Sequence, residues 1–147
     1  QTGQIINVSS TSGVRAIGGL GLYAASKFAL EGWSEALAIT LSPYNIPVSI
    51  VQPGTVKNDW AAHCVFIPSS DNRLAENLLN KLLTLSKGGQ PCEEIGQLIV
   101  NIARDNKPHM RYQTSEKVKE TVSKKLVDIS GDSMRDEQIL FFKSLVQ

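Results

Sequence analysis

The first 54 residues predict a strand, a long helix and a second strand with short connections between them. Residues 4–9 (QIINVS) form a short, β-branched apolar run that is typical of a strand buried on both faces of a sheet. Residues 22–41 repeat apolar side chains at steps of three and four, and Pro43 ends this helix. The run IPVSIVQPG at 46–54 predicts the second strand. Such a unit forms a right-handed parallel crossover, so the sequence predicts an α/β fold.

The remaining residues predict more elements of the same kind. Residues 10–21, which hold four glycines, and residues 55–70 are expected to be loops. Almost nothing precedes the apolar strand at 4–9 that could pair with its other edge, so we expect the chain to be the C-terminal part of a larger protein. Further helices are expected at 73–85, 91–104, 116–127 and 136–146, and a third strand at 108–114.

Composition argues against several classes of function. The net charge of +1 gives no reason to expect a nucleic acid partner. Two cysteines cannot build a disulfide scaffold in a chain this long, and no apolar run approaches the ~20 residues that a transmembrane helix needs. We expect a cytoplasmic protein. We expect no metal site, because His63, Cys64, Cys92 and His109 lack zinc-ligand spacing. The phenylalanines at 141–142 are expected in the core, with peripheral membrane association as the alternative.

Tyr23 and Lys27 are the residues that point to chemistry. They stand at positions i and i+4, so both side chains lie on one face of the helix. That helix begins beside the carboxyl end of the first strand, the edge at which open α/β sheets bind ligands. A lysine cation near a phenol stabilises the phenolate, which makes a tyrosine usable as an acid–base group near neutral pH. A nearby serine hydroxyl would stabilise charge on a substrate oxygen.

Three segments together resemble the short-chain dehydrogenase/reductase superfamily: GQIINVSS, YAASKFALEG and VSIVQPGTV. The family places a serine thirteen residues before its catalytic tyrosine, and that position here is Ser10; Ser9 and Ser12 are favoured less, on spacing alone. The Tyr-x-x-x-Lys motif of the family matches Tyr23 and Lys27. Tyr-x-x-x-Lys alone is a weak signal, and the serine in register makes the match specific.

The resemblance implies a role for each matched residue. Tyr23 would exchange a proton with the substrate oxygen, Lys27 would bind the nicotinamide ribose, and Ser10 would position the reacting oxygen. The cofactor would be NAD or NADP, with no preference readable, because the strand that sets it precedes these residues in the family. The nicotinamide pocket would also be shaped by three residues after the second strand: Pro53, Gly54 and Val56.

The resemblance also implies an architecture. Residues 1–147 would be the C-terminal half of one doubly wound, Rossmann-like parallel sheet with flanking helices. The family's nucleotide-binding half, with its glycine-rich turn and its asparagine-bearing helix, would lie before residue 1. We therefore expect this polypeptide alone neither to bind the cofactor tightly nor to turn over. Residues 55–90 would form the substrate loop, and Asn58 stands where the family often has a threonine, which weakens one cofactor contact.

The segment NKPHMRYQTSEKV resembles the hydroxysteroid and retinol dehydrogenase branch, which implies an alcohol or carbonyl substrate on a bulky apolar skeleton, such as a steroid or retinoid. In this family the tyrosine-bearing helix often pairs with a second subunit, so a homo-oligomer is implied. Phe28 and Trp33 on that helix are expected in the core or in such an interface. The alternative function is a non-enzymatic remnant that serves as a dimerisation or interaction module.

Overall fold

A computed structural model of the chain describes residues 3–65, 72–127, 130 and 132–146. Three short 3-10 helices, η1 (Thr11–Gly13), η2 (Ser42–Tyr44) and η3 (Trp60–His63), lie in stretches that were expected to be irregular or to follow a helix end. The main elements follow the predicted order, with shorter strands and an earlier start for the last helix. They are β1 (Ile5–Val8), α1 (Gly21–Leu41), β2 (Val48–Gln52), α2 (Asn72–Lys87), α3 (Cys92–Arg104), β3 (Arg111–Gln113), α4 (Glu116–Val127) and α5 (Asp132–Val146).

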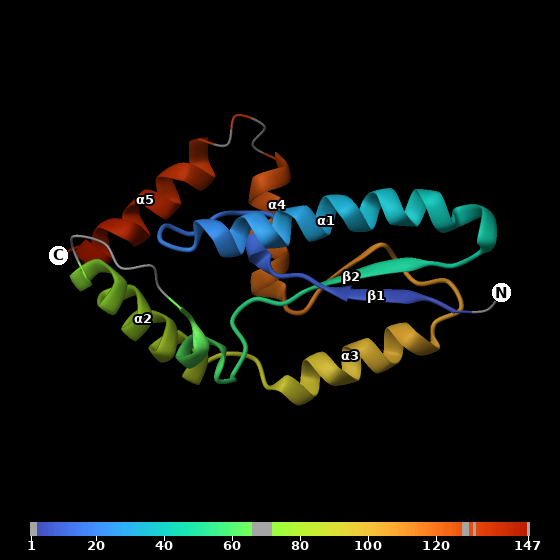
Figure 1. Cartoon of the computed structure of the whole chain (residues 1–147), viewed down its shortest axis with the longest axis horizontal. Coiled ribbons are helices and arrows are strands. Elements are labelled where there is room, and N and C mark those ends of the chain that lie inside the picture. The colour runs from blue at the N-terminus through green and yellow to red at the C-terminus, as the bar shows by residue number, and fades with distance from the viewer. Residues whose placement is uncertain (1–2, 66–71, 128–129, 131, 147) are drawn as a thin grey trace.

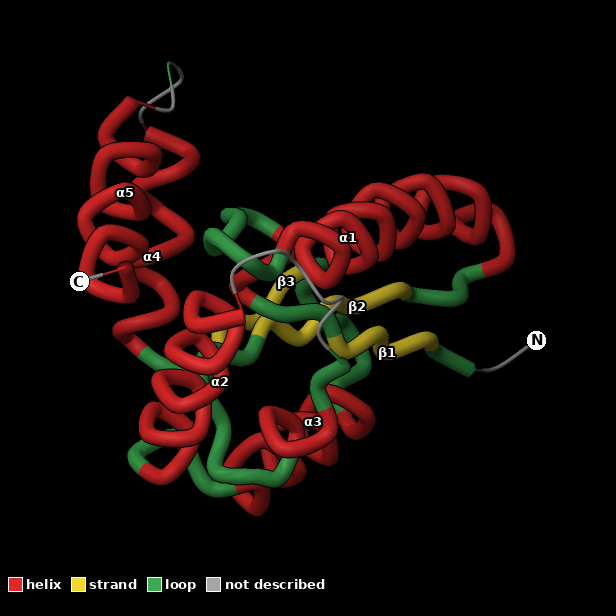
Figure 2. The backbone as a smooth tube through the Cα atoms, turned by 60° about the vertical axis from the view of Figure 1, so that its left-hand side comes forward, coloured by secondary structure: helices red, strands yellow, loops and turns green. Residues whose placement is uncertain are grey.

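The three strands form one parallel sheet in the order β1-β2-β3. Ile5 lies opposite Val48, and Ile50 lies opposite Arg111. Helix α1 covers one face of the sheet and α3 covers the other, while α2 and α5 lie beyond one end of the strands (Figures 1 and 2). The predicted α/β class, a parallel sheet with flanking helices, is therefore confirmed.

The face of the sheet that α3 covers is apolar. Helix α3 has Glu93 and Glu94 in its first turn and Arg104 in its last, charges that suit the two ends of the helix dipole. Its apolar residues recur at helical spacing, and the buried Ile95 and Ile102 pack with Val51 of β2. Non-directional burial of apolar area holds this layer together.

The face that α1 covers buries polar groups beside apolar ones such as Ile50, which shares the face of Gln52 on β2. Asn7 on β1 donates from Nδ2 to Ser34 Oγ at 2.9 Å. Gln52 on β2 donates from Nε2 to Glu31 Oε1 at 3.0 Å, and Arg111 on β3 donates from Nε to Glu31 Oε2 at 3.1 Å. Glu31, Ser34 and Gln52 are all buried, and each has a partner, as buried polar groups require.

The outer face of α1 carries the large apolar side chains. Because polar and small residues occupy its inner face, the helix leaves Leu22, Phe28, Trp33 and Ile39 exposed. The expectation that Phe28 and Trp33 belong to the core is wrong for this reason, and the interface alternative stays a prediction. No helix within the described residues is long and apolar enough to cross a membrane.

A second apolar cluster lies beside the start of α1. Leu20 and Leu78 are buried there, and Tyr23, Leu74 and Phe141 pack against them. Phe141 thus contributes to packing, as predicted, while the side chain of the neighbouring phenylalanine lies outside the described residues. The cluster joins α2 and α5 to the segment that carries the candidate tyrosine.

Candidate functional site

The carboxyl ends of β1 and β2 open into a cavity of about 680 Å³. Its wall includes the loop before α1, the loop after β2, η3, and parts of α2, α3 and α5. The position is the strand-end edge that the sequence indicated. Five of the six predicted site residues line this cavity: Ser10, Tyr23, Pro53, Gly54 and Val56.

Ser10 stands where β1 has ended and the chain turns into η1. Its backbone is extended, and its Oγ accepts a hydrogen bond from Ser12 N at 3.1 Å as the N-cap of η1. The hydroxyl hydrogen of Ser10 is left to donate elsewhere. A Cβ added at Gly13 would lie 2.6 Å from Ser9 Oγ, so the glycine lets η1 lie close to the strand end. Ser9 and Ser12 line the same cavity, so the structure does not single out Ser10.

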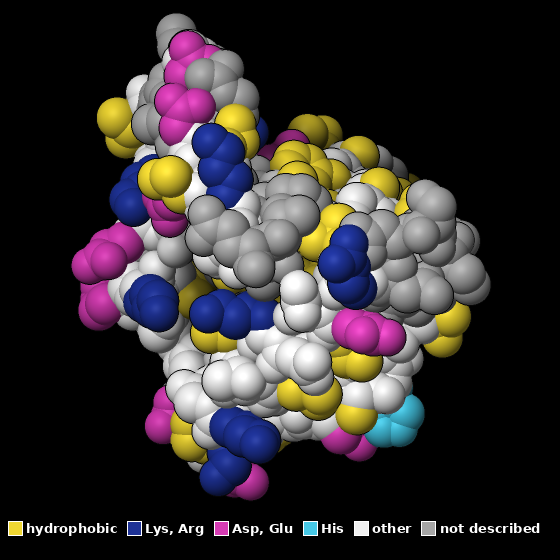
Figure 3. Space-filling view, turned by 90° about the vertical axis from the view of Figure 1, so that its left-hand side faces the viewer, with side chains coloured by type: hydrophobic (Ala, Val, Ile, Leu, Met, Phe, Trp, Pro, Cys, Tyr) yellow, Lys and Arg dark blue, Asp and Glu magenta, His cyan; other side chains and the backbone are white. Residues whose placement is uncertain are grey.

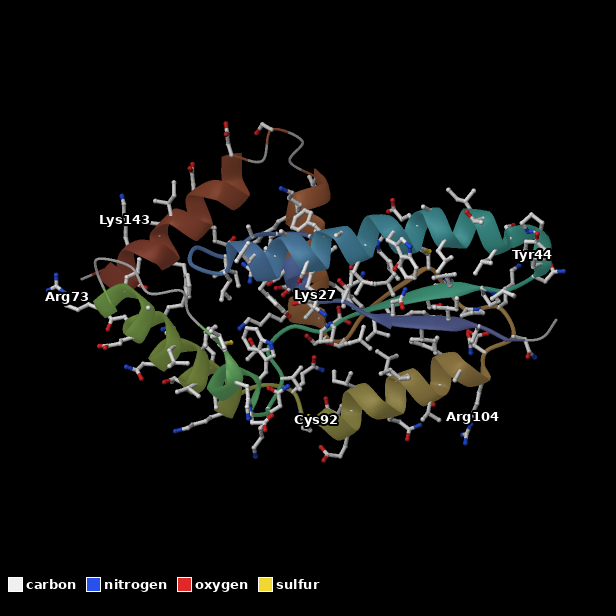
Figure 4. All side chains as sticks on the ribbon, viewed as in Figure 1. Lys27, Tyr44, Arg73, Cys92, Arg104 and Lys143 are labelled. Atoms are coloured by element: carbon white, nitrogen blue, oxygen red, sulfur yellow. The ribbon has the colours of Figure 1, made fainter. Side chains whose placement is uncertain are left out.

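Tyr23 and Lys27 lie in the first two turns of α1. The Lys27 Nζ donates to the Val8 carbonyl at 3.0 Å and lies 5.9 Å from the centroid of the Tyr23 ring. The lysine, labelled in Figure 4, therefore ties α1 to the end of β1, while its charge stays near the Tyr23 ring. One of its three ammonium donors is used by Val8, so two remain for other partners. Lys27 itself is not part of the cavity wall described above.

Tyr23 packs against an aromatic residue from the predicted substrate loop. The ring centroids of Tyr23 and Trp60 are 4.9 Å apart at an interplanar angle of 51°. Asn58, also in the wall, accepts a hydrogen bond from Trp60 N at 3.2 Å, so its side chain shapes the turn that holds this indole. Residues 66–71 of the predicted 55–90 loop lie outside the described residues, and much of the rest is helix α2.

The loop after β2 is anchored from several directions. Thr11 N donates to the Pro53 carbonyl at 2.9 Å, and a Cβ at Gly54 would lie 2.8 Å from Val118 Cγ2 of α4. Val56 forms an isolated parallel bridge with Gln90. Glycine at position 54 therefore allows a close approach that a larger residue would prevent.

Sequence reasoning missed the role of Gln90. Its backbone pairs with this loop, and its Nε2 donates to the Thr114 carbonyl at 2.8 Å. Gln90 follows Gly88 and Gly89, between the helices expected at 73–85 and 91–104, and no local pattern there indicates a partner more than thirty residues away. Two charged residues of the cavity wall, Arg15 and Glu137, were also missed.

Other reactive side chains near the cavity have ordinary structural partners. Cys92 Sγ lies 3.4 Å from the Lys57 carbonyl, and Cys64 Sγ lies 3.5 Å from the Trp60 carbonyl. Burial raises the pKa of the Cys64 thiol, which keeps it neutral. Across the described ranges, no group of three or more His, Cys, Asp and Glu is arranged to hold a metal ion.

Comparisons with known proteins agree with this architecture. The sequence model of a family described as short chain dehydrogenase matches residues 1–64. Human retinol dehydrogenase 8 is 33% identical over 140 residues, which cover 88% of this chain and 45% of that protein. The 3-ketodihydrosphingosine reductase of Bacteroides thetaiotaomicron is 38% identical over 112 residues, or 72% of this chain and 42% of the reductase. The chain thus spans less than half the length of these relatives.

A solved structure shows the same fold. The crystal structure of a short-chain dehydrogenase from Streptomyces avermitilis superposes with a TM-score of 0.69 at 23% identity, covering 94% of this chain and 51% of that one. The match includes the parallel sheet and the flanking helices, which supports the Rossmann-like architecture.

Proposed function

Because the chain belongs to the short-chain dehydrogenase/reductase superfamily, we propose that it carries the catalytic part of an oxidoreductase that interconverts an alcohol and a carbonyl. The observation that carries the proposal is one arrangement. Ser10 and Tyr23 face the same cavity at the strand ends, and the Lys27 ammonium lies beside the Tyr23 ring.

The residues at the strand ends fit the nicotinamide part of NAD or NADP. The loop after β2 is fixed by the Thr11–Pro53 hydrogen bond and presents backbone at Gly54 and Val56 to the cavity. Lys27 keeps donors for a ribose hydroxyl after binding Val8. When bound, the nicotinamide supplies or accepts the hydride. The glycine-rich turn that would hold the pyrophosphate is expected before residue 1, so residues 1–147 are proposed as the C-terminal catalytic part of one domain.

The chain's own residues would handle the proton and the orientation of the substrate. Tyr23 Oη gives a proton to the carbonyl oxygen during reduction and takes it back from the hydroxyl during oxidation. The Lys27 cation stabilises the phenolate form at that moment. Ser10 donates its remaining hydroxyl hydrogen to the same substrate oxygen and holds it in place.

The substrate proposed is a bulky apolar alcohol or its carbonyl partner. The wall beyond Tyr23 is largely apolar, with Ile17, Leu82, Ile99 and Phe141 among its residues. Two relatives are named for retinol and for 3-ketodihydrosphingosine, and these names support a steroid- or retinoid-sized skeleton without identifying it. We place the protein in the cytoplasm, where the two free cysteines stay reduced.

Exchange of Tyr23 for phenylalanine tests the proposal. The protein is expressed with the coding sequence upstream of Gln1 and assayed with NADH and NADPH. Tyr23→Phe should lower turnover by ~10²–10⁴-fold, because general acid–base catalysis contributes about that much. Thermal unfolding should be unchanged, since the ring and its contact with Trp60 remain.

Tyr44→Phe is the matched control, because Tyr44 is exposed on η2, away from the cavity wall. It should leave turnover unchanged. If Tyr23→Phe is equally silent, or if no carbonyl is reduced at all, the oxidoreductase proposal fails.

The alternative function is an interaction module, and the apolar outer face of α1 is the observation that favours it. The same face also supports a homo-oligomer, with the α1 helices of two copies packed together. Small residues at positions 25, 29, 32 and 36 would allow the close approach. An enzyme and a module both use this face, so assembly alone does not separate them, whereas the Tyr23→Phe result does.

A further inference from the structure

The wall of the cavity holds charges that the proposed chemistry does not use. Among the described lining residues, two carry formal charge, Arg15 on the loop before α1 and Glu137 on α5. Among the described residues on the face drawn in Figure 3, basic and acidic side chains lie in separate places. A single arginine in a mostly apolar cavity therefore calls for its own explanation.

The Arg15 guanidinium has unused hydrogen-bond capacity. Its Nε is buried without a partner, and in the described part of the chain the side chain makes no hydrogen bond or ion pair. Burial lowers the pKa of Arg15, because the charged form loses water, and the nearby charge of Glu137 partly offsets this. A guanidinium stays charged in proteins, so the buried Nε–H of Arg15 lacks the partner that burial demands.

Glu137 does not supply that partner. Its Oε2 accepts a hydrogen bond from Lys124 Nζ at 3.0 Å, and that pair lies at the surface. Neutralising Glu137 therefore does not by itself explain why Arg15 lies in this cavity. Its donors are available to a group that enters the cavity.

The position of Arg15 relates its charge to the reacting end of the cavity. It lies five residues after Ser10 and eight before Tyr23, and all three line one cavity. We propose that Arg15 binds an anionic group, a carboxylate or a phosphate, carried by an otherwise apolar substrate. This inference rests on the proposed function in treating the bound molecule as a substrate, but the binding of an anion at Arg15 does not require hydride transfer.

Binding is measured by the fluorescence of Trp60, which lies in the cavity wall. Residues 1–147 hold two tryptophans, so the Trp60 signal is defined as the fluorescence change that Trp60→Phe abolishes. The probes are dodecanoate, dodecyl phosphate and methyl dodecanoate, each below its critical micelle concentration. They share the apolar chain and differ in charge, so the ratio of their dissociation constants isolates the anionic group.

We expect at least one anion to bind about ten-fold more tightly than the ester, as hydrogen bonds to a charged group allow. Arg15→Met should bring the anions to within about two-fold of the ester, while the ester keeps its affinity and so reports an intact cavity. Arg15→Lys should keep part of the preference, because it retains the charge and loses the planar fork. Glu137→Gln should tighten the anions and leave the ester unchanged, because it removes a nearby negative charge.

The proposal is overturned if no probe binds, if the anions bind no more tightly than the ester, or if the preference survives Arg15→Met. Should Arg15→Met fail to fold, Arg15→Lys and Glu137→Gln still decide, since an unchanged anion preference in both contradicts a role for the guanidinium. A retained anion preference together with a silent Tyr23→Phe would mean that the cavity binds anions without reducing them. That result would refute the proposed function and leave the Arg15 site standing.

Discussion

The two faces of the sheet are built by different kinds of interaction. On the α3 side, Val51, Ile95 and Ile102 pack as a continuous apolar layer. On the α1 side, Glu31 accepts hydrogen bonds from Gln52 and Arg111, so that one carboxylate links α1 to two strands. Apolar packing is non-directional and allows a helix to shift along the sheet, whereas these hydrogen bonds form at only one position of α1 relative to the strands.

This difference bears on the candidate site. Tyr23 and Lys27 lie on α1, and their position relative to the strand ends depends on how α1 is fixed along the sheet. The buried carboxylate of Glu31 is one turn beyond Lys27, so the polar network holds the helix near the residues proposed for catalysis. We therefore expect the α3 side to contribute mainly apolar packing, and the hydrogen bonds of the α1 side to fix where that helix lies along the sheet.

The apolar face should show the largest loss of stability. Ile102 is 2% exposed, and Ile102→Ala removes buried carbon atoms and leaves a cavity. We expect the free energy of unfolding to fall by about 3 kcal/mol, measured by urea titration followed by circular dichroism. Val100→Ala on the same helix is the control, because Val100 is 40% exposed, and it should change stability by less than about 1 kcal/mol. Equal losses in the two variants would show that α3 does not form the core of this face.

The polar face should show a smaller loss with a different signature. Glu31→Gln keeps the shape but removes the charge that Arg111 binds, and it should cost about 2 kcal/mol. Glu35→Gln is the control, because Glu35 also binds Arg111 but is more than half exposed, and it should cost about 0.5 kcal/mol or less. The two costs are measured as urea unfolding at low and high salt. Only the Glu31→Gln cost should persist in high salt, because a buried pair is screened little.

The Arg111 guanidinium sets the pH dependence of the stability that its ion pair with Glu31 contributes. Burial alone would lower the pKa of Arg111, but its hydrogen bonds to Glu35 and Glu31 and their charges raise it above the ordinary value. A raised folded-state pKa means that the stabilisation is fully present below the ordinary pKa and is lost only as the pH rises through the folded one. The cost of Glu31→Gln should therefore be constant between about pH 7 and pH 10. A cost that declines across this range would contradict the network.

The sequence predicted the strands and the candidate site more fully than it predicted α1. Apolar runs at 4–9 and 46–54 marked β1 and β2. β2 is buried throughout, as a strand covered on both faces is, whereas β1 is only half-buried and Val8 is exposed, so the expected burial of the first strand on both faces is wrong. Tyr23 and Lys27 were expected at the sheet edge because their helix begins beside the end of the first strand, and Ser10 was added by the family resemblance. For α1, Phe28 and Trp33 were expected in the core or in a subunit interface, and the core alternative is wrong because the buried positions are Ala24, Glu31 and Ser34.

That error has a physical cause. Hydrophobic periodicity identifies the apolar stripe of a helix but cannot say which layer the stripe faces. Here the hydrogen-bond partners of Glu31 are Gln52 and Arg111, which are 21 and 80 residues away in the chain. The Val56–Gln90 bridge and the inward position of Arg15 depend on similarly distant segments, so no local pattern indicated them.

The exposed apolar face of α1 leads to the prediction with the smallest effect on stability. Trp33 is 56% exposed on the outer face of α1, so Trp33→Glu should change the free energy of unfolding of the monomer by about 0.5 kcal/mol or less. If a second copy covers this face, the same exchange places a charge in an apolar interface and should convert the oligomer to monomer, measured by sedimentation velocity. Tyr44→Glu is the control, because Tyr44 is 59% exposed on η2, outside that face, and it should leave the mass unchanged. A wild-type chain that stays monomeric at every concentration would contradict the interface, and the apolar stripe would then need a different partner.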